Sequence, residues 1–237
     1  EKGVSQGEGM TIHAPQALLE ELISAAQALS ALGLNVNKSG NVSARYDTGF
    51  FITPTGLAYE LLTPEDLVWI PLHESVTEAQ MQGQRRPSSE WAMHAAVYRQ
   101  RTDVEAVVHT HSLYATALAC QNMPIPAFHY MVAAAGGDSI EVVPYETFGT
   151  PQLAHAVANG LEDRDACLME HHGVIAVGRT LRKAITLANE VENLAHKYVI
   201  VRQLGEPRLL DAAEMARIKE KFKTYGQPQM KDGTKHE

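Results

Sequence analysis

Helical and strand-forming segments alternate along almost the whole sequence, and neither a repeat nor a low-complexity linker separates them. Residues 15–32 place apolar side chains at helical spacing after Pro15 and end before Gly33, which is typical of an amphipathic helix. The β-prone runs 42–46 and 50–53 flank an Asp-Thr-Gly turn, which predicts a hairpin. Because both kinds of element are mixed throughout the chain, the sequence predicts one α/β domain.

The remaining segments extend this alternation. Further strands are predicted over residues 67–71, 104–111, 140–144, 166–170 and 174–177. Further helices are predicted over residues 88–101, 150–161, 180–204 and 211–222, and a short one ends near Cys120. We expect side-chain caps from Ser88 or Ser89, from Thr150 and from Asp211. The polar stretch 73–87 lacks apolar periodicity and is predicted to be a surface loop.

The composition excludes several kinds of protein. The chain carries 20 Lys+Arg against 28 Asp+Glu, and this acidic balance argues against nucleic acid as a partner. No apolar run approaches the roughly 20 residues that a membrane span requires, so no membrane partner is expected. The two cysteines, Cys120 and Cys167, do not form a C-x-x-C pair. This favours a reducing compartment, and we expect a cytoplasmic protein.

The two ends of the chain differ from the rest in composition. Residues 1–10 are rich in Gly, Ser and Gln and are predicted to be a leader or tag remnant. Residues 227–237 are polar and are predicted to be a flexible tail. The folded domain is therefore expected over residues 11–226.

Some of the 11 histidines occur in patterns that suit a metal ion. His109 and His111 form an H-x-H pair near the end of a predicted strand, where side chains two residues apart share one face. A third ligand can come from the Glu170-His171-His172-Gly173 turn. Three imidazoles with one open position are typical of a catalytic zinc site. Glu90 would be a fourth ligand or an acid/base beside the metal.

Each pattern alone also has an ordinary explanation. An H-x-H pair can be the polar face of a half-buried strand, and His and Gly are tolerated in turns. Their combination favours metal binding, since the sequence lacks a nucleophile elbow, a phosphate loop, a dinucleotide-binding fingerprint and an H-E-x-x-H motif. A cupin-type oxygenase also uses H-x-H, but its all-β jelly roll conflicts with the predicted helices.

Three segments of small residues are suited to an anion. Ser39-Gly40-Asn41, Thr53-Pro54-Thr55-Gly56 and Ser88-Ser89 offer hydroxyls, an amide and flexible backbone N–H groups. A phosphate would fit such groups if the fold brings them together. Taken singly, each segment is better explained as an ordinary turn or cap.

These residues are part of a longer series of motifs that runs in order through nearly the whole chain after Met10. The series comprises Gly40-Asn41-Val42-Ser43, Ile52-Thr53-Pro54-Thr55-Gly56, Pro87-Ser88-Ser89-Glu90-Trp91, Val107-Val108-His109-Thr110-His111, His129-Tyr130-Met131 with Ala133-Ala134-Ala135-Gly136-Gly137, Phe148-Gly149-Thr150, His171-His172-Gly173 and Phe222-Lys223-Thr224-Tyr225-Gly226. In these motifs the chain resembles the zinc-dependent class II aldolase/adducin-head family. The resemblance implies a single domain with a central, mostly antiparallel sheet flanked by helices.

The resemblance also implies a site and a reaction. One zinc ion per subunit would be held by Glu90, His109, His111 and His172. The phosphate of a ketose 1-phosphate would be held by Gly40, Asn41, Thr55, Gly56, Ser88 and Ser89. The enzyme would be a lyase that reversibly cleaves this sugar to dihydroxyacetone phosphate and an aldehyde, and no Schiff-base lysine would be required.

Aromatic residues of the family complete the expected site. Glu90 would double as acid/base, and Tyr130 would act from a neighbouring subunit on the oxygen of the aldehyde half. Phe148 and Phe222 would shape the pocket, and the segment that carries Phe222 and the catalytic Tyr225 would close over it. The resemblance therefore implies a homotetramer with active sites between subunits.

The identity of the aldehyde stays open at this point. The substrate would be L-fuculose 1-phosphate, or a 5-deoxy- or 5-methylthio-ribulose 1-phosphate that uses the same machinery. Asn37-Lys38-Ser39 departs from the small residues usual before Gly-Asn in the family. The alternatives are a pentose-phosphate 4-epimerase of the same family and a non-catalytic interaction domain like the adducin head. His94 and His129 are expected to be structural.

Overall fold

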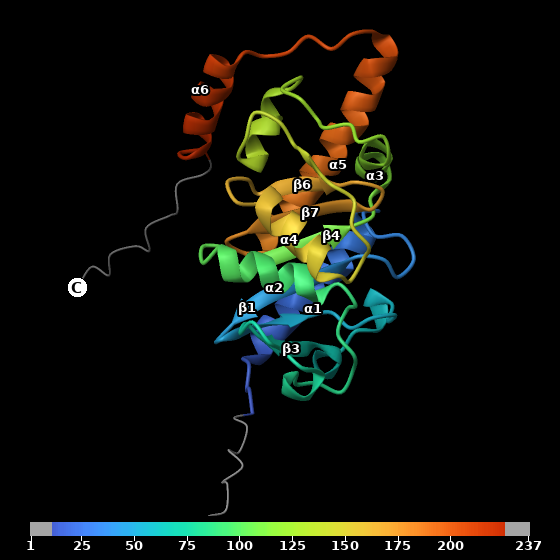
Figure 1. Ribbon diagram of the computed structural model, residues 1–237, viewed down its shortest axis with the longest axis vertical. Helices are drawn as coiled ribbons and strands as arrows, with labels where there is room; N and C mark the ends of the chain where they lie inside the picture. Colours follow the sequence, from blue (N-terminus) through green and yellow to red (C-terminus); the bar gives the residue numbers. More distant parts are fainter. Residues whose placement is uncertain (1–10, 226–237) are drawn as a thin grey trace, which may run out of the picture.

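A single sheet organises the protein, as the computed structural model of residues 11–225 shows (Figure 1). Within this range seven strands pair in the order β3-β2-β1-β4-β7-β6-β5. Only β5 and β6 run parallel, and every other neighbouring pair is antiparallel. The strands are β1 (Asn41–Tyr46), β2 (Gly49–Ile52), β3 (Val68–Pro71), β4 (Ala106–Thr110), β5 (Val142–Val143), β6 (Ala166–Met169) and β7 (Gly173–Gly178). The mostly antiparallel sheet is therefore confirmed.

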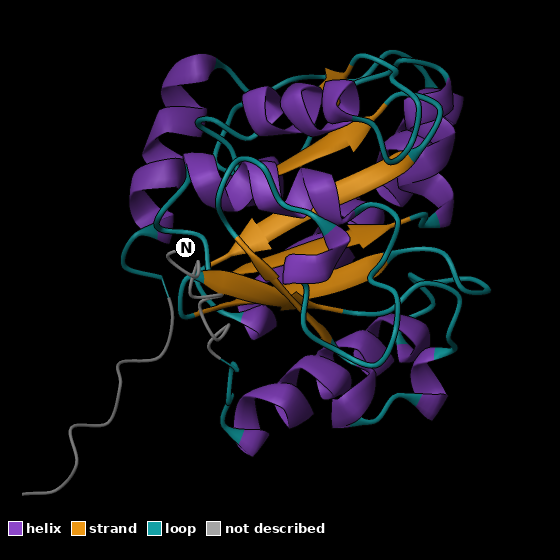
Figure 2. Ribbon diagram, turned by 60° about the horizontal axis from the view of Figure 1, so that its bottom comes forward, coloured by secondary structure: helices purple, strands orange, loops and turns teal. Residues whose placement is uncertain are grey.

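Helices cover both faces of this sheet (Figure 2). They are α1 (Gln16–Ala31), α2 (Trp91–Gln100), α3 (Leu113–Cys120), α4 (Pro151–Gly160), α5 (Leu181–Leu204) and α6 (Ala212–Phe222). One buried apolar cluster includes residues of α1, α3 and α5, and a second includes residues of α2 and α4. On β4, Val108 joins the first cluster and Val107 the second, as expected for side chains that alternate between faces. The single α/β domain is thus confirmed as a three-layer structure.

Most predicted elements are present, and two of the predicted caps are confirmed. The side chain of Thr150 accepts a hydrogen bond from the N–H of Leu153, and that of Asp211 accepts one from the N–H of Glu214. The predicted serine cap is wrong, because α2 begins at Trp91 and no side chain caps it. The backbone N–H of Ser88 is tied to Thr53 O at 3.0 Å. This bond keeps the serine pair on the loop before the helix.

Other differences concern the ends of strands and the loops. Strand β4 stops at Thr110, so His111 lies just beyond it. The strand expected over 140–144 is reduced to β5, because Ile140 pairs with Ile125 in an isolated bridge. The predicted loop 73–87 contains the 3₁₀ turn Glu78–Gln80. The longer 3₁₀ segment η4 (Tyr130–Ala135) was also not predicted by the sequence.

The expectations for the chain ends lie outside the described residues. They concern the leader at 1–10 and the tail at 227–237, and the structure describes residues 11–225. Within that range, no helix combines the length and the apolar character needed to cross a bilayer.

Candidate metal centre and anion cavity

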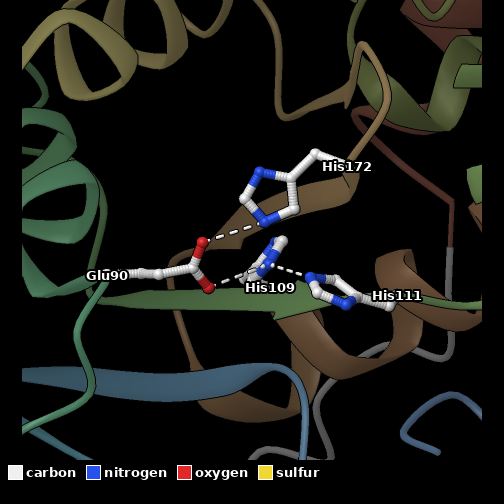
Figure 3. A group of neighbouring side chains, drawn as sticks. All are labelled: Glu90, His109, His111 and His172. Carbon is white, nitrogen blue, oxygen red and sulfur yellow. Dashed lines mark hydrogen bonds and ion pairs between the residues drawn. The ribbon is translucent and has the colours of Figure 1, made fainter. Parts of the chain in front are cut away.

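Three imidazole rings face one another at the end of the central strand (Figure 3). His109 lies on β4, His111 follows that strand, and His172 lies in the turn between β6 and β7. The ring centroids of His109 and His111 are 4.9 Å apart, those of His109 and His172 4.8 Å, and those of His111 and His172 4.9 Å. The predicted convergence of the H-x-H pair with the His-His-Gly turn is therefore present.

Gly173 allows the turn to approach β4 this closely. A Cβ atom at Gly173 would lie 2.4 Å from the carbonyl oxygen of Thr110 and 3.0 Å from Cδ2 of His111. No other residue type can occupy this position without moving one of the strands. His171, two residues before Gly173, has a φ of 54°. Its ring centroid lies 5.9 Å from that of Tyr145. Only the second histidine of the pair belongs to the cluster.

Glu90 completes the cluster from the residue before α2. Its Oε2 lies 3.2 Å from Nε2 of His109, and its Oε1 lies 2.9 Å from Nε2 of His172. Asn41 donates a hydrogen bond from Nδ2 to Glu90 Oε2 at 3.0 Å. The ligand atoms of Glu90, His109, His111 and His172 all lie within 4.8 Å of one another.

The protonation states of these residues suit a cation. Nδ1 of His109 lies 2.9 Å from the carbonyl oxygen of Val174; since a carbonyl can only accept, Nδ1 carries the proton and Nε2 presents a lone pair. Nε2 of His111 lies 3.0 Å from Nε2 of His109. Glu90 Oε1 is buried and receives no well-directed hydrogen bond. Three imidazoles and one carboxylate whose ligand atoms converge in this way are the donor set of a metal site.

The pKa values of His111 and Glu90 also favour metal binding. Burial is the main cause of the lowered pKa of His111, which is about 4. Burial raises the pKa of Glu90, but the combined effect of His109 and His172 is larger and lowers the pKa overall. A neutral imidazole and an ionised carboxylate are the forms that bind metals.

A cavity of about 460 Å³ opens beside this cluster, and its lining joins segments that are far apart in the sequence. All six residues predicted to hold a phosphate contribute to the lining, namely Gly40, Asn41, Thr55, Gly56, Ser88 and Ser89. Phe148, predicted as a pocket residue, also lines it, as do Glu90, His111 and His172. Three of the four candidate metal ligands and the small-residue segments therefore share one cavity.

The backbone turns explain why glycine occurs at two of these positions. Gly40 has a φ of 88°, and a Cβ atom there would lie 2.7 Å from the carbonyl oxygen of His109. Gly56 has a φ of 70° and nothing within 4 Å of its hypothetical Cβ. The left-handed backbone conformation alone explains the glycine at position 56. At position 40, the close approach to β4 is a second reason for glycine.

Three predicted site residues are not brought to this cavity by a single chain. Tyr130, Phe222 and Tyr225 lie beside one another, with ring centroids 6.4 Å apart for the first pair and 6.1 Å for the second. Tyr130 begins η4, Phe222 ends α6 and Tyr225 follows that helix. All three are absent from the residues that line the cavity. Tyr130 is 50% exposed and Tyr225 84% exposed.

Two lining residues, Lys38 and Tyr145, were not selected by sequence reasoning. Ser39 and Pro54, from the predicted anion segments, and His171 also line the cavity. Lys38 is the cation among the described lining residues. Its departure from the family pattern before Gly-Asn was the signal that could have identified it.

Comparisons with known proteins agree with this geometry. The family model for the class II aldolase and adducin N-terminal domain matches residues 20–199. The 5-methylthioribulose-1-phosphate/5-deoxyribulose-1-phosphate aldolase of Rhodospirillum rubrum is 50% identical over 210 residues, which cover 89% of this chain and 93% of the relative. The L-fuculose phosphate aldolase of Escherichia coli strain K12 is 46% identical over 210 residues, covering 88% and 95%.

A solved structure gives the same result for the fold. An L-fuculose 1-phosphate aldolase superposes with a TM-score of 0.83 at 37% identity, and the match covers 92% of this chain and 100% of that one. The matched family region contains Glu90, His109, His111 and His172, which form the cluster in Figure 3. The chain therefore belongs to the class II aldolase family and is an enzyme of the aldehyde-lyase type.

Proposed function

We propose that the protein is a zinc-dependent aldolase that reversibly cleaves a ketose 1-phosphate to dihydroxyacetone phosphate and an aldehyde. The observation that carries this proposal is the shared cavity, because it joins a cluster of metal ligands to three anion-binding segments. Curated relatives at 50% and 46% identity are aldolases for ketose 1-phosphates, which supports the same reaction.

Zinc would be held by Glu90, His109, His111 and His172. The set fits zinc because it offers three imidazole nitrogens and one carboxylate. When bound, zinc supplies a Lewis acid that stabilises the negative charge left on the ketone half after the C3–C4 bond breaks. The chain would thus need no Schiff-base lysine.

The phosphate of the substrate would be bound by Gly40, Asn41, Thr55, Gly56, Ser88 and Ser89. Backbone N–H groups at turns and serine or threonine hydroxyls donate hydrogen bonds to phosphate oxygens. Lys38 would add a positive charge, since its side chain is exposed at the same cavity and makes no ion pair within residues 11–225. An acidic protein can in this way bind an anion through local donors.

Glu90 would move the proton. Glu90 lines the same cavity as the phosphate segments, so its carboxylate would face the carbon that becomes C3 of dihydroxyacetone phosphate. In the cleavage direction it would deliver a proton to this carbon, and in the synthetic direction it would remove one. Asn41 orients the carboxylate by donating to Oε2.

The aldehyde half of the reaction would use aromatic residues. Phe148 shapes the pocket from within the chain. Tyr130, Phe222 and Tyr225 would reach the cavity of a neighbouring copy in a homotetramer, where Tyr130 and Tyr225 would act on the aldehyde oxygen. The absence of these three residues from the cavity of their own chain supports a shared site. The enzyme would work in the cytoplasm.

The candidate substrates are L-fuculose 1-phosphate, 5-deoxyribulose 1-phosphate and 5-methylthioribulose 1-phosphate. All three share the phosphate and the ketone half and differ in the aldehyde released. The exposed rings of Tyr145 and Phe148 line the cavity and suit an apolar substituent on that aldehyde.

Incubation of the zinc-loaded protein with each sugar tests the proposal. Dihydroxyacetone phosphate is detected with a coupled glycerol-phosphate dehydrogenase, and we expect release from at least one of the three sugars. Inversion of a pentose phosphate without release of dihydroxyacetone phosphate would favour the epimerase instead. Zinc-loaded protein that is inert toward all of these sugars would overturn the proposal.

A further inference from the structure

A chain of buried polar side chains leads from Glu90 into the interior of the protein. Glu90 Oε2 accepts from Asn41 Nδ2 at 3.0 Å, and Asn41 Oδ1 contacts Nε2 of His94. Nδ1 of His94 lies 2.7 Å from Ser43 Oγ, which lies 2.7 Å from the hydroxyl of Tyr98. Each of these five residues is buried.

Hydrogen-bonding capacity fixes the direction of every bond in this chain. A carboxylate only accepts, so Asn41 must present its NH₂ group to Glu90 and its oxygen to His94. Nε2 of His94 must then donate, and Nδ1 accepts from the hydroxyl of Ser43. Ser43 has only one proton, so its oxygen accepts from Tyr98. All four bonds therefore point toward the carboxylate.

Other contacts hold the far end of the chain in place. The ring of Tyr98 lies 5.1 Å from that of Phe50 and 4.9 Å from the guanidinium carbon of Arg45. Arg45 also donates to the carbonyl oxygen of Tyr98 at 2.9 Å. Burial is the main cause of the lowered pKa of His94, which is about 3. A neutral His94 is what the deduced direction requires.

We propose that His94, Ser43 and Tyr98 are positioning residues that hold the amide of Asn41 with its NH₂ group toward Glu90. Without them the amide can rotate by a half turn and present its oxygen to the carboxylate, and Glu90 then loses its donor. The role in turnover rests on the proposed aldolase function, because it concerns the carboxylate that moves the proton. The hydrogen-bond direction is a property of the folded chain alone.

Substitutions along the chain test the role in turnover. In His94→Leu the donor to Asn41 is lost, and we expect kcat to fall by about 10- to 100-fold while zinc content stays at one per subunit. His94→Gln keeps an N–H that can donate to Asn41, so it should recover part of this loss. Tyr98→Phe removes only the last donor and should lower kcat by a few fold.

A matched control separates positioning from packing. Tyr198→Phe also removes a hydroxyl from a buried tyrosine, but Tyr198 lies on α5 against Phe128. It should leave kcat unchanged. If His94→Leu fails to fold, the kcat values of Ser43→Ala and Tyr98→Phe test the role in turnover instead. Full kcat in the folded variants at wild-type zinc content would overturn the role in turnover.

The hydrogen-bond direction is tested without any activity measurement. In ¹⁵N-histidine-labelled protein, long-range ¹H–¹⁵N spectra should show His94 as the neutral Nε2–H tautomer from pH 5.5 to 8.5. A proton on Nδ1, or a cationic ring, would overturn the deduced direction. If wild type cleaves no ketose 1-phosphate, the proposed function fails, while this spectrum still decides the geometry.

Discussion

The two groups of predicted site residues differ in how a single chain places them. The first group consists of the predicted metal ligands and anion-binding segments. The sheet brings them together from five parts of the sequence, and all of them except the buried His109 line one cavity. The second group is Tyr130, Phe222 and Tyr225, which contact one another and lie outside this cavity. Glu90 is 7% exposed, whereas Tyr225 is 84% exposed.

This difference indicates for which half of the proposed reaction a single chain supplies all of the predicted residues. Buried polar residues are costly unless they are satisfied, so the first group is fixed by hydrogen bonds and strand pairing within the fold. Exposed aromatic side chains are available for contact with another molecule. The ketone half of the proposed reaction would thus depend on one chain and the aldehyde half on two.

The largest effect is expected from the metal ligands. His111→Ala should lose bound zinc and lower kcat/KM by about 1000-fold or more, because several kcal/mol of charge stabilisation depend on the metal. Metal analysis of the purified protein and the coupled assay measure both effects. The control is His171→Ala, whose ring lies outside the cluster and should leave the zinc content unchanged. A metal-free but active His111→Ala protein would contradict the assignment.

Tyr130→Phe tests the second group. We expect kcat to fall by about 100-fold, because a proton donor at the aldehyde oxygen is lost, while the zinc content stays the same. Mixed with Glu90→Gln under conditions that exchange subunits, it should regain activity, since some shared sites then carry both intact residues. Mixtures that stay as inactive as the two variants alone would contradict a site built from two chains.

Gly173→Ala should disturb the positions of the predicted metal ligands through steric overlap alone. The new Cβ atom would meet the carbonyl oxygen of Thr110 at 2.4 Å, and such overpacking costs about 1–3 kcal/mol of stability. Thermal unfolding measures the loss, and zinc affinity should fall with it. A wild-type zinc affinity in Gly173→Ala would show that strand spacing does not set the ligand geometry.

Lys38→Ala should affect binding more than turnover. Loss of one charge near the phosphate is expected to raise KM by about 10-fold with little change in kcat. The increase should shrink at high salt, since an exposed charge is screened. Lys183→Ala, an exposed lysine at the start of α5, is the control. An unchanged KM at low salt would remove Lys38 from the phosphate site.

The smallest effect is expected at an ion pair that anchors the loop before Ser88. A hydrogen bond from Arg85 is the main cause of the lowered pKa of Asp66, and the N–H of Thr63 adds to it. Arg85→Ala should cost about 0.5 kcal/mol near pH 7, because Arg85 is largely exposed. A carboxylate with a lowered pKa stabilises the fold above its unfolded pKa and loses this contribution as pH falls through the folded value. Unfolding curves of both proteins should therefore converge below about pH 3.

Much of the fold could be predicted from the sequence because local signals agree with the tertiary structure. Thr150, Asp211 and Gly205 mark helix ends that the structure confirms. The prediction of a serine cap on α2 was wrong, because a hydrogen bond to Thr53 holds Ser88 on the loop. This long-range contact leaves no local signal, and neither does the 3₁₀ segment η4.

The candidate site was predictable to a similar extent. The H-x-H spacing and the His-His-Gly turn indicated ligands, and the sheet order brings them together. Their convergence with the phosphate segments depends on pairing between β1 and β4, which spacing alone does not reveal. Lys38 and Tyr145 were missed because each is an ordinary surface residue until the cavity is known. His94 was expected to be structural, and its contacts with Asn41 and Ser43 were not foreseen.

The four candidate ligands come from separate parts of the backbone: the residue before α2, β4, the segment after β4, and the turn between β6 and β7. A cation bound by all four cross-links these parts and binds only when they are all folded. Metal occupancy and the stability of the middle of the sheet are then linked thermodynamically. At a free metal concentration 100 times the dissociation constant, the folded state gains about 2.7 kcal/mol. A chelator would weaken the fold first where the central strand meets its neighbours.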